Sequence, residues 1–526
     1  MKRREFIRLT APVAALPFIW NGFSLTAYGR SRFSDALLKT TTDTDRVFVL
    51  VQLIGGNDGL NTVIPLDQYS AYQAARSNIA IPEATLQATK LSDATALHPA
   101  MTHLKSLFDE QKLAVVQGVS YPNPNLSHFR ATDIWLTAAD YDQYLESGWL
   151  GRYVDEEFPG YPDGFPTEAM PDPVAIQISS VVSNALQGVT GSAGTAITNP
   201  NGSYLSPGES GQPPNTFAGA QVAYILGVQS QTQQYSTVVK AAYNNAQNKS
   251  TLYPASGQNT LADQLAIVAR LIAGGLKTRI YVVNIGGFDT HSSQVTNSDA
   301  TTGTHAALLG KLSLAIGAFM DDVNLLGVMD RVVGMTFSEF GRRIKSNASY
   351  GTDHGTSEPM FIFGSKINGG LYGKNPTLPA NATVNDNLSM QYDFRQIYSS
   401  VLAQWFNVGT DELTSVLWQQ FDALPIFDSI TGLRNTSAPG EFQLYQNYPN
   451  PFNPSTTINY QLPAESDVTV KVFDALGKKI ETLVNKHQNA GLHAVEFDAR
   501  GLASGVYFYQ IEAGILRDVK KMIYAK

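Results

Sequence analysis

Short apolar runs, separated by segments with helical periodicity, dominate the chain from residue 45 to residue 430. The strand-like runs are Val47 to Ile54, Leu113 to Val119, Arg279 to Ile285, Arg331 to Phe337 and Met360 to Phe363. None of them alternates apolar with polar residues, which favours strands covered on both faces, as in a parallel sheet. Apolar residues recur at helical spacing in 308–326 and 394–406. The alternation predicts an α/β domain with a mostly parallel central sheet and flanking helices.

Two segments depart from this pattern. Residues 186–260 are dense in Ser, Gly, Asn, Gln and Thr, and we expect a polar insertion, partly helical and partly loop. Residues 431–441 are expected to be a linker. Residues 442–526 contain short alternating strands separated by turn dipeptides, a pattern that predicts a small all-β sandwich.

Composition limits the chemistry that this chain can perform. Its 526 residues are too many for one ordinary core. The absence of cysteine excludes disulfides, thiol nucleophiles and thiolate metal sites. A formal net charge of −8 without a dense basic segment argues against a nucleic-acid partner. Any metal must therefore be bound by Asp, Glu, His, Asn or backbone oxygen.

The N-terminal sequence MKRREFIRLTAPVAALPFIW predicts an export signal within residues 1–30. Arg3 and Arg4 precede a short apolar run broken by prolines, which is typical of a twin-arginine signal. An ordinary secretory signal with a chance arginine pair is the alternative, and both predict export from the cytoplasm. No later run approaches ~18 apolar residues, so we expect no transmembrane segment in the mature chain.

The residues that follow the strands carry the candidate chemistry, since open α/β sheets bind ligands beyond the carboxyl ends of their strands. GGNDGLN follows the first strand and places Asp58 there, either as a metal ligand or as a turn-forming residue. Ser127, after the second strand, is expected to be the N-cap of a helix that begins at His128 or Phe129. A helix N-terminus favours anions, so Ser127 is a candidate nucleophile and His128 a candidate ligand or acid; a plain cap is the alternative.

The third strand is followed by GGFDTHSSQ, the most informative local motif. In extended geometry Asp289 and His291 point to the same side. A carboxylate and an imidazole on one side form half of a metal site. A hydrogen-bonded structural pair is the alternative.

The fourth strand is followed by Glu339 and Arg342, and Asp353 and His354 precede the last strand. Glu339, Asp353 and His354 are candidate metal ligands. Arg342 could orient an oxyanion through two hydrogen bonds. The alternatives are a surface arginine and a turn-forming aspartate.

Several segments together resemble the bacterial family called domain of unknown function 1501: LVQLIGGNDGLNTVIP, NLSHFRATDIW, SGWLGRYVD, GGFDTHSSQ, FSEFGRRI and GTDHG. The resemblance spans residues 45–410. This family resembles the alkaline phosphatase and sulfatase superfamily, whose members hold divalent metals at strand ends and cleave phosphate or sulfate esters. The resemblance implies an alkaline phosphatase-like domain over residues 45–430 and a divalent metal: zinc, manganese or calcium.

The same resemblance assigns roles to individual residues. The nucleophile of the superfamily corresponds to Ser127, the mid-chain Asp and His pair to Asp289 and His291, and the last histidine to His354. One metal site is therefore implied on the latter three side chains.

A second metal site would use Asp58 and Glu339, but Phe340 stands where the superfamily has a ligand histidine. Asp353 or His128 would have to supply the missing donor. The implied activity is metal-dependent hydrolysis of a phosphate or sulfate ester. The alternative is a catalytically degenerate surface protein that binds a glycan, a polymer or a partner protein, because a fold does not prove an activity. A hydrolase of some other bond is a third reading.

The tail resembles the C-terminal sorting domain of the type IX secretion system. The resemblance rests on YPNPFNPST, FDALG, LASGVYFY and the closing Lys520-Lys521-Met522. It implies recognition by the type IX secretion machinery and delivery to the outer-membrane surface or the extracellular space. A carbohydrate-binding or adhesive sandwich is the alternative.

Overall fold

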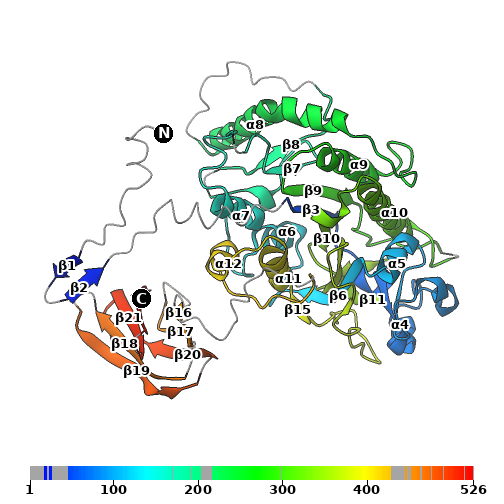
Figure 1. The fold of residues 1–526 in the computed structure, drawn as a ribbon. Coiled ribbons are helices and arrows are strands. Elements are labelled where there is room, and N and C mark those ends of the chain that lie inside the picture. The colour runs from blue at the N-terminus through cyan, green and yellow to red at the C-terminus, as the bar shows by residue number, and fades with distance from the viewer. Residues whose placement is uncertain are drawn as a thin grey trace. The chain divides into compact units, whose positions relative to one another are not determined.

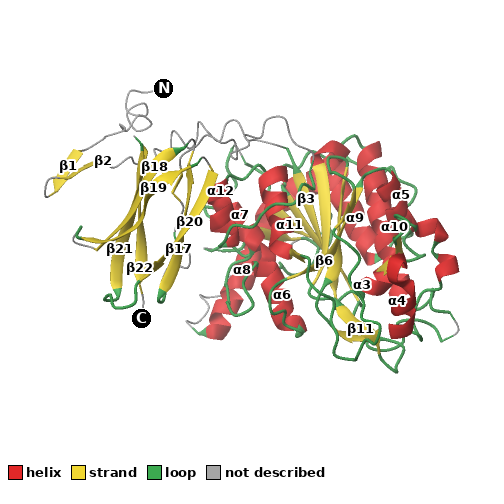
Figure 2. Cartoon of the chain, turned by 90° about the horizontal axis from the view of Figure 1, so that it is seen from below, coloured by secondary structure: helices red, strands yellow, loops and turns green. Residues whose placement is uncertain are grey.

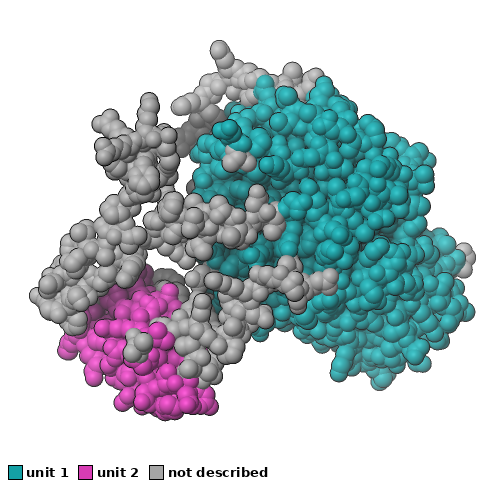
Figure 3. Space-filling view, viewed as in Figure 1, with its two compact units in different colours: residues 1–429 teal, residues 430–526 magenta. Residues whose placement is uncertain are grey.

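The chain divides into two units, residues 1–429 and 430–526, which Figure 3 colours separately. The structure is a computed structural model that describes residues 17–20, 23–26, 45–168, 170–189, 191–202, 216–297, 299–427, 443–444, 447, 452–462, 465–474, 477–489, 491–514 and 516–524. Arg3 and Arg4 of the predicted export signal and the predicted linker at 431–441 lie outside these residues. Near the N-terminus, β1 (Pro17–Trp20) and β2 (Phe23–Thr26) form an antiparallel pair.

A mixed sheet forms the centre of the first unit (Figure 1). Its order is β14-β6-β13-β10-β3-β9-β7-β8, and β15 also pairs with β6. The strands are β3 (Val47–Ile54), β6 (Leu113–Ser120), β7 (Ala175–Gln177), β8 (Gly194–Ala196), β9 (Ile280–Gly286), β10 (Val332–Ser338), β13 (Glu358–Gly364), β14 (Gly370–Tyr372) and β15 (Tyr392–Asp393). The predicted mostly parallel sheet is confirmed, and each predicted strand is present within two residues of its expected ends.

One strand differs from the expectation of parallel pairing. β13 is antiparallel to both of its neighbours, β6 and β10. Its residues are nonetheless buried throughout, like those of the parallel strands. A continuous apolar run reports burial on both faces of a sheet and carries no information about strand direction.

Helices cover both faces of this sheet (Figure 2). β3 shows the cause, because its side chains alternate between two cores. Val49 and Val51 pack with residues of α5, α9 and α10, whereas Phe48 and Leu50 pack with residues of α6, α7 and α11. The helices are α3 (Gly59–Thr62), α4 (Tyr69–Ala75), α5 (Thr102–Asp109), α6 (His128–Thr137), α7 (Trp149–Glu157), α8 (Phe217–Asn245), α9 (Thr260–Ala273), α10 (Thr304–Leu325), α11 (Phe394–Ser400) and α12 (Thr410–Leu417).

Both predicted helical segments are helical. Residues 308–326 fall almost wholly within α10, and residues 394–406 form α11 followed by a π-helical turn, Val401–Trp405. The segment 186–260 contains β8 and the long helix α8. None of the described helices has the length and apolar character that crossing a membrane requires.

Short elements complete the first unit. They are the antiparallel pairs β4 (Val63–Pro65) with β5 (Thr95–Leu97) and β11 (Arg342–Ser346) with β12 (Thr352–His354), and the 3-10 turns Leu66–Gln68, Glu83–Thr85, Gln87–Thr89, Asn184–Leu186 and Met329–Arg331. The β11–β12 hairpin matters most here, because it ends at the candidate site.

The second unit is all-β, as predicted. Two antiparallel sheets, β16-β17-β20 and β19-β18-β21-β22, enclose one apolar core that includes Tyr460, Val470 and Tyr509. The strands are β16 (Gln443–Leu444), β17 (Ser455–Leu462), β18 (Ser466–Asp474), β19 (Lys479–Gln488), β20 (Gly491–Asp498), β21 (Gly505–Ala513) and β22 (Leu516–Tyr524).

Candidate metal centre

The carboxyl ends of β3, β9 and β10 lie next to one another. In the parallel ladders Ile54 of β3 is level with Gly286 of β9, and the last residue of β10 is level with the preceding position of β3. The loops that leave β9 and β10 therefore bring Asp289 and Glu339 to one edge of the sheet. The β11–β12 hairpin adds His354 there, because this residue pairs with the first residue of β11.

Gly55 allows the β3 and β9 loops to approach closely. Its φ of +125° is in the left-handed region, and a Cβ atom at this position would lie 2.3 Å from the backbone nitrogen of Asp289. The Gly55 N–H also donates to Glu339 Oε1 at 2.9 Å. The glycine that follows the buried strand is therefore needed for a backbone contact that builds the site.

Three side chains, His128, Asp289 and His354, have donor atoms that all lie within 4.8 Å of one another. His128 Nε2 is 3.5 Å from Asp289 Oδ2, and His354 Nε2 is 3.5 Å from Asp289 Oδ1. His291 is a neighbour of this group, with its Nε2 3.3 Å from Asp289 Oδ1 and 2.9 Å from His354 Nε2. Three imidazoles thus direct Nε2 toward one carboxylate.

The other nitrogen of each imidazole contacts an oxygen. The pairs are His128 Nδ1 with Glu339 Oε1 at 2.7 Å, His291 Nδ1 with Asp353 Oδ1 at 3.3 Å and His354 Nδ1 with the Leu126 carbonyl oxygen at 2.8 Å. A carboxylate or carbonyl oxygen accepts, so it favours the tautomer in which Nδ1 carries the proton. Each Nε2 then presents a lone pair to the others. This arrangement, with an oxygen behind each ligating histidine, is the usual outer support of metal-binding imidazoles.

The contact between His291 Nε2 and His354 Nε2 follows from this assignment. Two lone pairs 2.9 Å apart would repel each other, whereas a proton on His291 Nε2 would make the contact a hydrogen bond and a shared cation would make it a pair of ligands. Burial, and then the nearby charges of Arg342, His128 and His291, hold the pKa of His354 below its usual value, against the hydrogen bond to Leu126. A lowered pKa favours the neutral imidazole of His354, which is the form that can act as a metal ligand.

The donor set also limits which cation this group of side chains could bind. Imidazole nitrogen with one or two carboxylate oxygens suits zinc and manganese. Calcium takes six to eight oxygen ligands. Of the three metals expected from the sequence, calcium therefore fits this group of donors least well.

Arg342 has a different place from the one expected of an oxyanion-binding group. Its side chain is fully buried, and it donates to the carbonyl oxygens of Gly55, Gly56, Phe288 and Thr352 and to Asp289 Oδ1. Burial raises the pKa of Asp289, but the hydrogen bond and charge of Arg342 outweigh it, so this pKa is below its usual value. Arg342 therefore ties the loops together and keeps Asp289 ionised, instead of facing a ligand.

Asp58 is not brought into the group of donors. Its carboxylate is fully buried and accepts two hydrogen bonds from Arg76 Nη1, at 2.7 and 2.6 Å, and one from Gln294 Nε2 at 2.6 Å. Gln294 Oε1 in turn accepts from the hydroxyls of Thr290 and Thr352. Asp58 is thus the base of a hydrogen-bond network behind the site.

Ser127 occupies the N-cap position of α6, as the sequence predicts, but its side chain accepts no capping hydrogen bond. The residue is exposed, and its N–H donates to Asn125 Oδ1 at 2.9 Å. Its hydroxyl therefore does not cap the helix, which was the alternative interpretation of this residue.

Phe340, which stands in the expected position of a ligand histidine, packs on the imidazoles instead. Its ring centroid lies 4.8 Å from that of His128 and 4.5 Å from that of His354. A Cβ atom on Gly56 would lie 2.3 Å from the ring, which shows how tightly the phenyl group is held. Phe340 fixes the orientation of two imidazoles through packing.

An open cleft of about 550 Å³ adjoins the group of donors. Its lining residues are Ile54, Gly55, His128, Phe129, Thr132, Asp133, Leu136, Asn184, Gly287, Asp289 and Glu339. This cleft gives a ligand access from solvent to His128 and Asp289.

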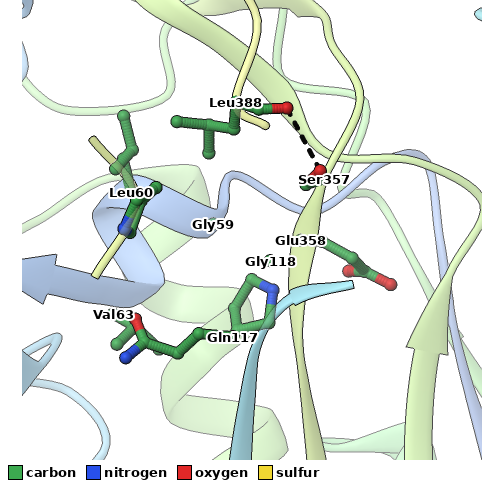
Figure 4. Close-up of a pocket in the computed structure, with 10 residues that line it drawn as sticks. Gly59, Leu60, Val63, Gln117, Gly118, Ser357, Glu358 and Leu388 are labelled. Atoms are coloured by element: carbon green, nitrogen blue, oxygen red, sulfur yellow. Dashed lines mark hydrogen bonds between the residues drawn. The ribbon is translucent and has the colours of Figure 1, made fainter. Parts of the chain in front are cut away.

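A second pocket, of about 20 Å³, lies where β13 begins (Figure 4). Gly59, Leu60, Gln117 and Ser357 line it, and Ser357 Oγ donates to the Leu388 carbonyl oxygen at 3.1 Å. In Figure 4 the Glu358 carboxylate points away from Leu60. A space of this size holds about one water molecule, so it is no substrate site.

Glu358 is a buried carboxylic acid beside Ser338, whose N–H donates to it at 2.6 Å. Burial, and then the charge of Glu339, raise its pKa well above the usual value, against the hydrogen bond from the Ser338 N–H. The folded state therefore binds a proton that the unfolded state loses, and stability is expected to fall as pH rises above the ordinary carboxyl pKa.

Glu358→Gln is accordingly expected to raise the unfolding temperature at pH 8 and to leave it unchanged near pH 4, because glutamine removes the cost of the buried charge. Thermal unfolding followed by the fluorescence of the buried Trp135, Trp149 and Trp405 measures this. The exposed Glu83→Gln is the control and should be neutral at both pH values. An effect of Glu358→Gln that is equal at both pH values would contradict the assignment.

The comparisons with known proteins agree with two of the sequence resemblances. Residues 209–417 match the family described as protein of unknown function (DUF1501), and residues 446–525 match the secretion system C-terminal sorting domain. The first match covers Asp289, Glu339 and His354 but begins after Ser127 and His128. The chain matches no curated protein.

Several solved structures are similar at low identity. An alkaline phosphatase superfamily protein from Vibrio parahaemolyticus is 10% identical over 84% of this chain and 81% of that chain, with a TM-score of 0.32. A phosphonate monoester hydrolase from Silicibacter pomeroyi is 9% identical over 87% and 90%, with a TM-score of 0.25. PorZ, a type IX secretion component of Porphyromonas gingivalis, is 22% identical over 20% of this chain and 14% of its own length, with a TM-score of 0.13. By its two family matches, the chain combines a segment similar to the DUF1501 family with a type IX secretion sorting domain, which directs it to the cell surface or the extracellular space.

Proposed function

We propose that the first unit is a metal-dependent hydrolase of phosphate or sulfate esters, exported through the sorting domain. The observation that carries the proposal is the convergence of three Nε2 atoms on Asp289, with His291 Nε2 and His354 Nε2 only 2.9 Å apart. A bound divalent cation supplies Lewis-acid polarisation of a phosphoryl or sulfuryl oxygen.

The side chains around that centre have separable tasks in this proposal. Glu339 holds the proton on His128 Nδ1, and Asp353 does the same for His291, so that both present Nε2 as a donor. The pKa of Asp353 is lowered, first by the hydrogen bond from Asn347 and further by His291, against the effect of burial. An ionised Asp353 is the stronger acceptor for an imidazole N–H.

Ser127 is the nucleophile in this proposal. It precedes His128 directly, is exposed, and stands at the N-terminus of α6, where unpaired N–H groups lower the cost of an alkoxide or a phosphoester. The alternative nucleophile is water, with Ser127 serving only to position the ester.

A surface protein that binds a ligand without cleaving it is the second candidate. Two observations favour it: Phe340 packs where a further ligand is expected, and Arg342 donates its hydrogen bonds to the protein instead of facing the cleft. Such a protein would keep the metal but turn over no ester.

Turnover of 4-nitrophenyl phosphate and 4-nitrophenyl sulfate by the zinc- or manganese-loaded full chain separates the two candidates. If the protein is a hydrolase, we expect turnover of at least one ester, and removal of the metal with a chelator should abolish it. Ser127→Ala should reduce this turnover at least ~100-fold, because the nucleophile is lost. The control is Ser106→Ala, at an exposed serine of α5 that does not line the cleft. Tightly bound metal with no turnover of either ester would contradict the hydrolase and favour the ligand-binding protein. Turnover that Ser127→Ala does not change would show that water, and not Ser127, is the nucleophile.

A further inference from the structure

One face of α6 forms the wall of the cleft beside the metal centre. The lining residues on this helix are His128, Phe129, Thr132, Asp133 and Leu136. Positions 129, 132, 133 and 136 have the spacing that places side chains on one side of a helix. The opposite side, with Ile134 and Trp135, is buried in the core. One face of the helix, with Ile134 and Trp135, therefore packs against the core, and the face that contains Phe129 and Thr132 lines the cleft.

Phe129 stands out on this face, because 91% of its surface is exposed. Ile54, which lines the same cleft, is 41% exposed. The exposed parts of these two side chains do not stabilise the fold, since an apolar group in water contributes no burial energy. Next to Phe129, Thr132, Asp133 and Asn184 supply hydrogen-bonding groups.

The charge of the cleft restricts what can occupy it. Among the described residues, no lysine or arginine lines it, whereas Asp133, Asp289 and Glu339 do. Arg130, on the same helix, is bound to Asp133 and to the carbonyl oxygens of residues 140, 141 and 143, and its guanidinium stacks 3.9 Å from the Tyr144 ring centroid. Outside the metal centre, the cleft therefore presents no free cation that could bind an anion.

We infer that this cleft binds an uncharged sugar ring that carries the ester, with its apolar C–H face against Phe129 and its hydroxyls toward Thr132, Asp133 and Asn184. A pyranose has both an apolar face and a ring of hydroxyls, which matches the mixture of side chains on this wall. The inference rests on the proposed function and narrows it: the scissile ester is the one anionic group of the bound unit, because the cleft has no lysine or arginine to bind the further anionic groups of a polyanionic glycan.

The test measures binding, so that it does not depend on catalysis. Calorimetry and saturation-transfer NMR on the full chain would use neutral tetrasaccharides of glucose, galactose and mannose, and the same sugars fully sulfated. We expect at least one neutral tetrasaccharide to bind, and Phe129→Ala to weaken its binding about tenfold, the loss of one aromatic contact. Val384→Ala, at an apolar position 60% exposed and outside the cleft, is the matched control and should bind normally.

A second pair of variants keeps this result separate from the proposed hydrolysis. His354→Ala, which disrupts the metal centre, should still bind the neutral sugar through the α6 wall. Asn184→Lys adds a cation to the exposed rim and should raise the affinity for the sulfated sugar several-fold. Tighter binding of the sulfated sugar by the unmodified chain, no binding of any neutral sugar, or unchanged binding by Phe129→Ala would overturn the inference. Neutral sugar binding without ester turnover would overturn only the hydrolase.

Discussion

Replacing His354 with alanine is expected to leave the purified, dialysed protein without its divalent metal. His354 is the least exposed of the three imidazoles, and its Nε2 lies 2.9 Å from His291 Nε2 and 3.5 Å from Asp289 Oδ1. Four-ligand protein sites bind zinc with about 10–16 kcal/mol. One ligand of four then accounts for about 2.5–4 kcal/mol, so a 100- to 1000-fold loss of affinity is expected.

The measurement is metal content by mass spectrometry, together with zinc affinity in competition with a chelator. Glu339→Gln removes the carboxylate behind His128 and should weaken binding by about 10–100-fold, less than the loss of a ligand. His487→Ala, an exposed histidine of the second unit, is the control and should keep the metal. Retention of full metal content by His354→Ala would refute this centre.

Local sequence patterns predict the positions of several residues of this centre. The GGFDTHSSQ motif places Asp289 and His291 beyond a buried strand, and the spacing of two residues gives their side chains a common direction. The parallel ladder between β3 and β9 then brings this strand end to the same edge as GGND. Position at a strand end was therefore predictable, because the apolar runs mark the buried strands and their alternation with helices favours a parallel sheet, whose ligands bind beyond the carboxyl ends of the strands.

The role of each polar residue at that edge was not predictable in the same way. Asp58 has the same sequence setting as Asp289, yet it is buried against Arg76, which lies 18 positions later at the end of α4. Arg342 could have faced a ligand, and instead donates to four backbone carbonyls. Which cation a carboxylate meets depends on tertiary contacts, and those leave no trace in local spacing.

Other contributors carry no sequence signal at all. The acceptor behind His354 is the backbone carbonyl oxygen of Leu126, and any residue at that position could supply it. The wall of the cleft depends on which face of α6 meets the core, and an exposed Phe129 reads in the sequence as one more core residue. These features can be identified only when the packing of α6 against the core is known.

The pair of Asp58 and Arg76 gives the largest expected effect on stability. Both side chains are fully buried, and Arg76 also donates to the carbonyl oxygens of Arg343 and Ile344. Arg76→Met is expected to lower the free energy of unfolding by about 3–5 kcal/mol, because it leaves a carboxylate buried without its cation. Adding Asp58→Asn to this variant should recover a large part of the loss, since the double variant buries no charge at this position.

Denaturant unfolding followed by tryptophan fluorescence measures both variants. The control is the surface pair of Lys105, which is partly buried, and Asp109, which is exposed; Lys105→Met should cost less than about 1 kcal/mol. Burial raises the pKa of Asp58, but the charges of Arg76 and His305 outweigh it and hold the pKa below its usual value. Ionised Asp58 therefore stabilises the fold above the ordinary carboxyl pKa, and the cost of Arg76→Met should shrink as pH falls.

Because Asp58 has no place among the donors around Asp289, the double variant should retain its metal once folded. Loss of metal in a folded double variant would show that Asp58 contributes to the metal centre.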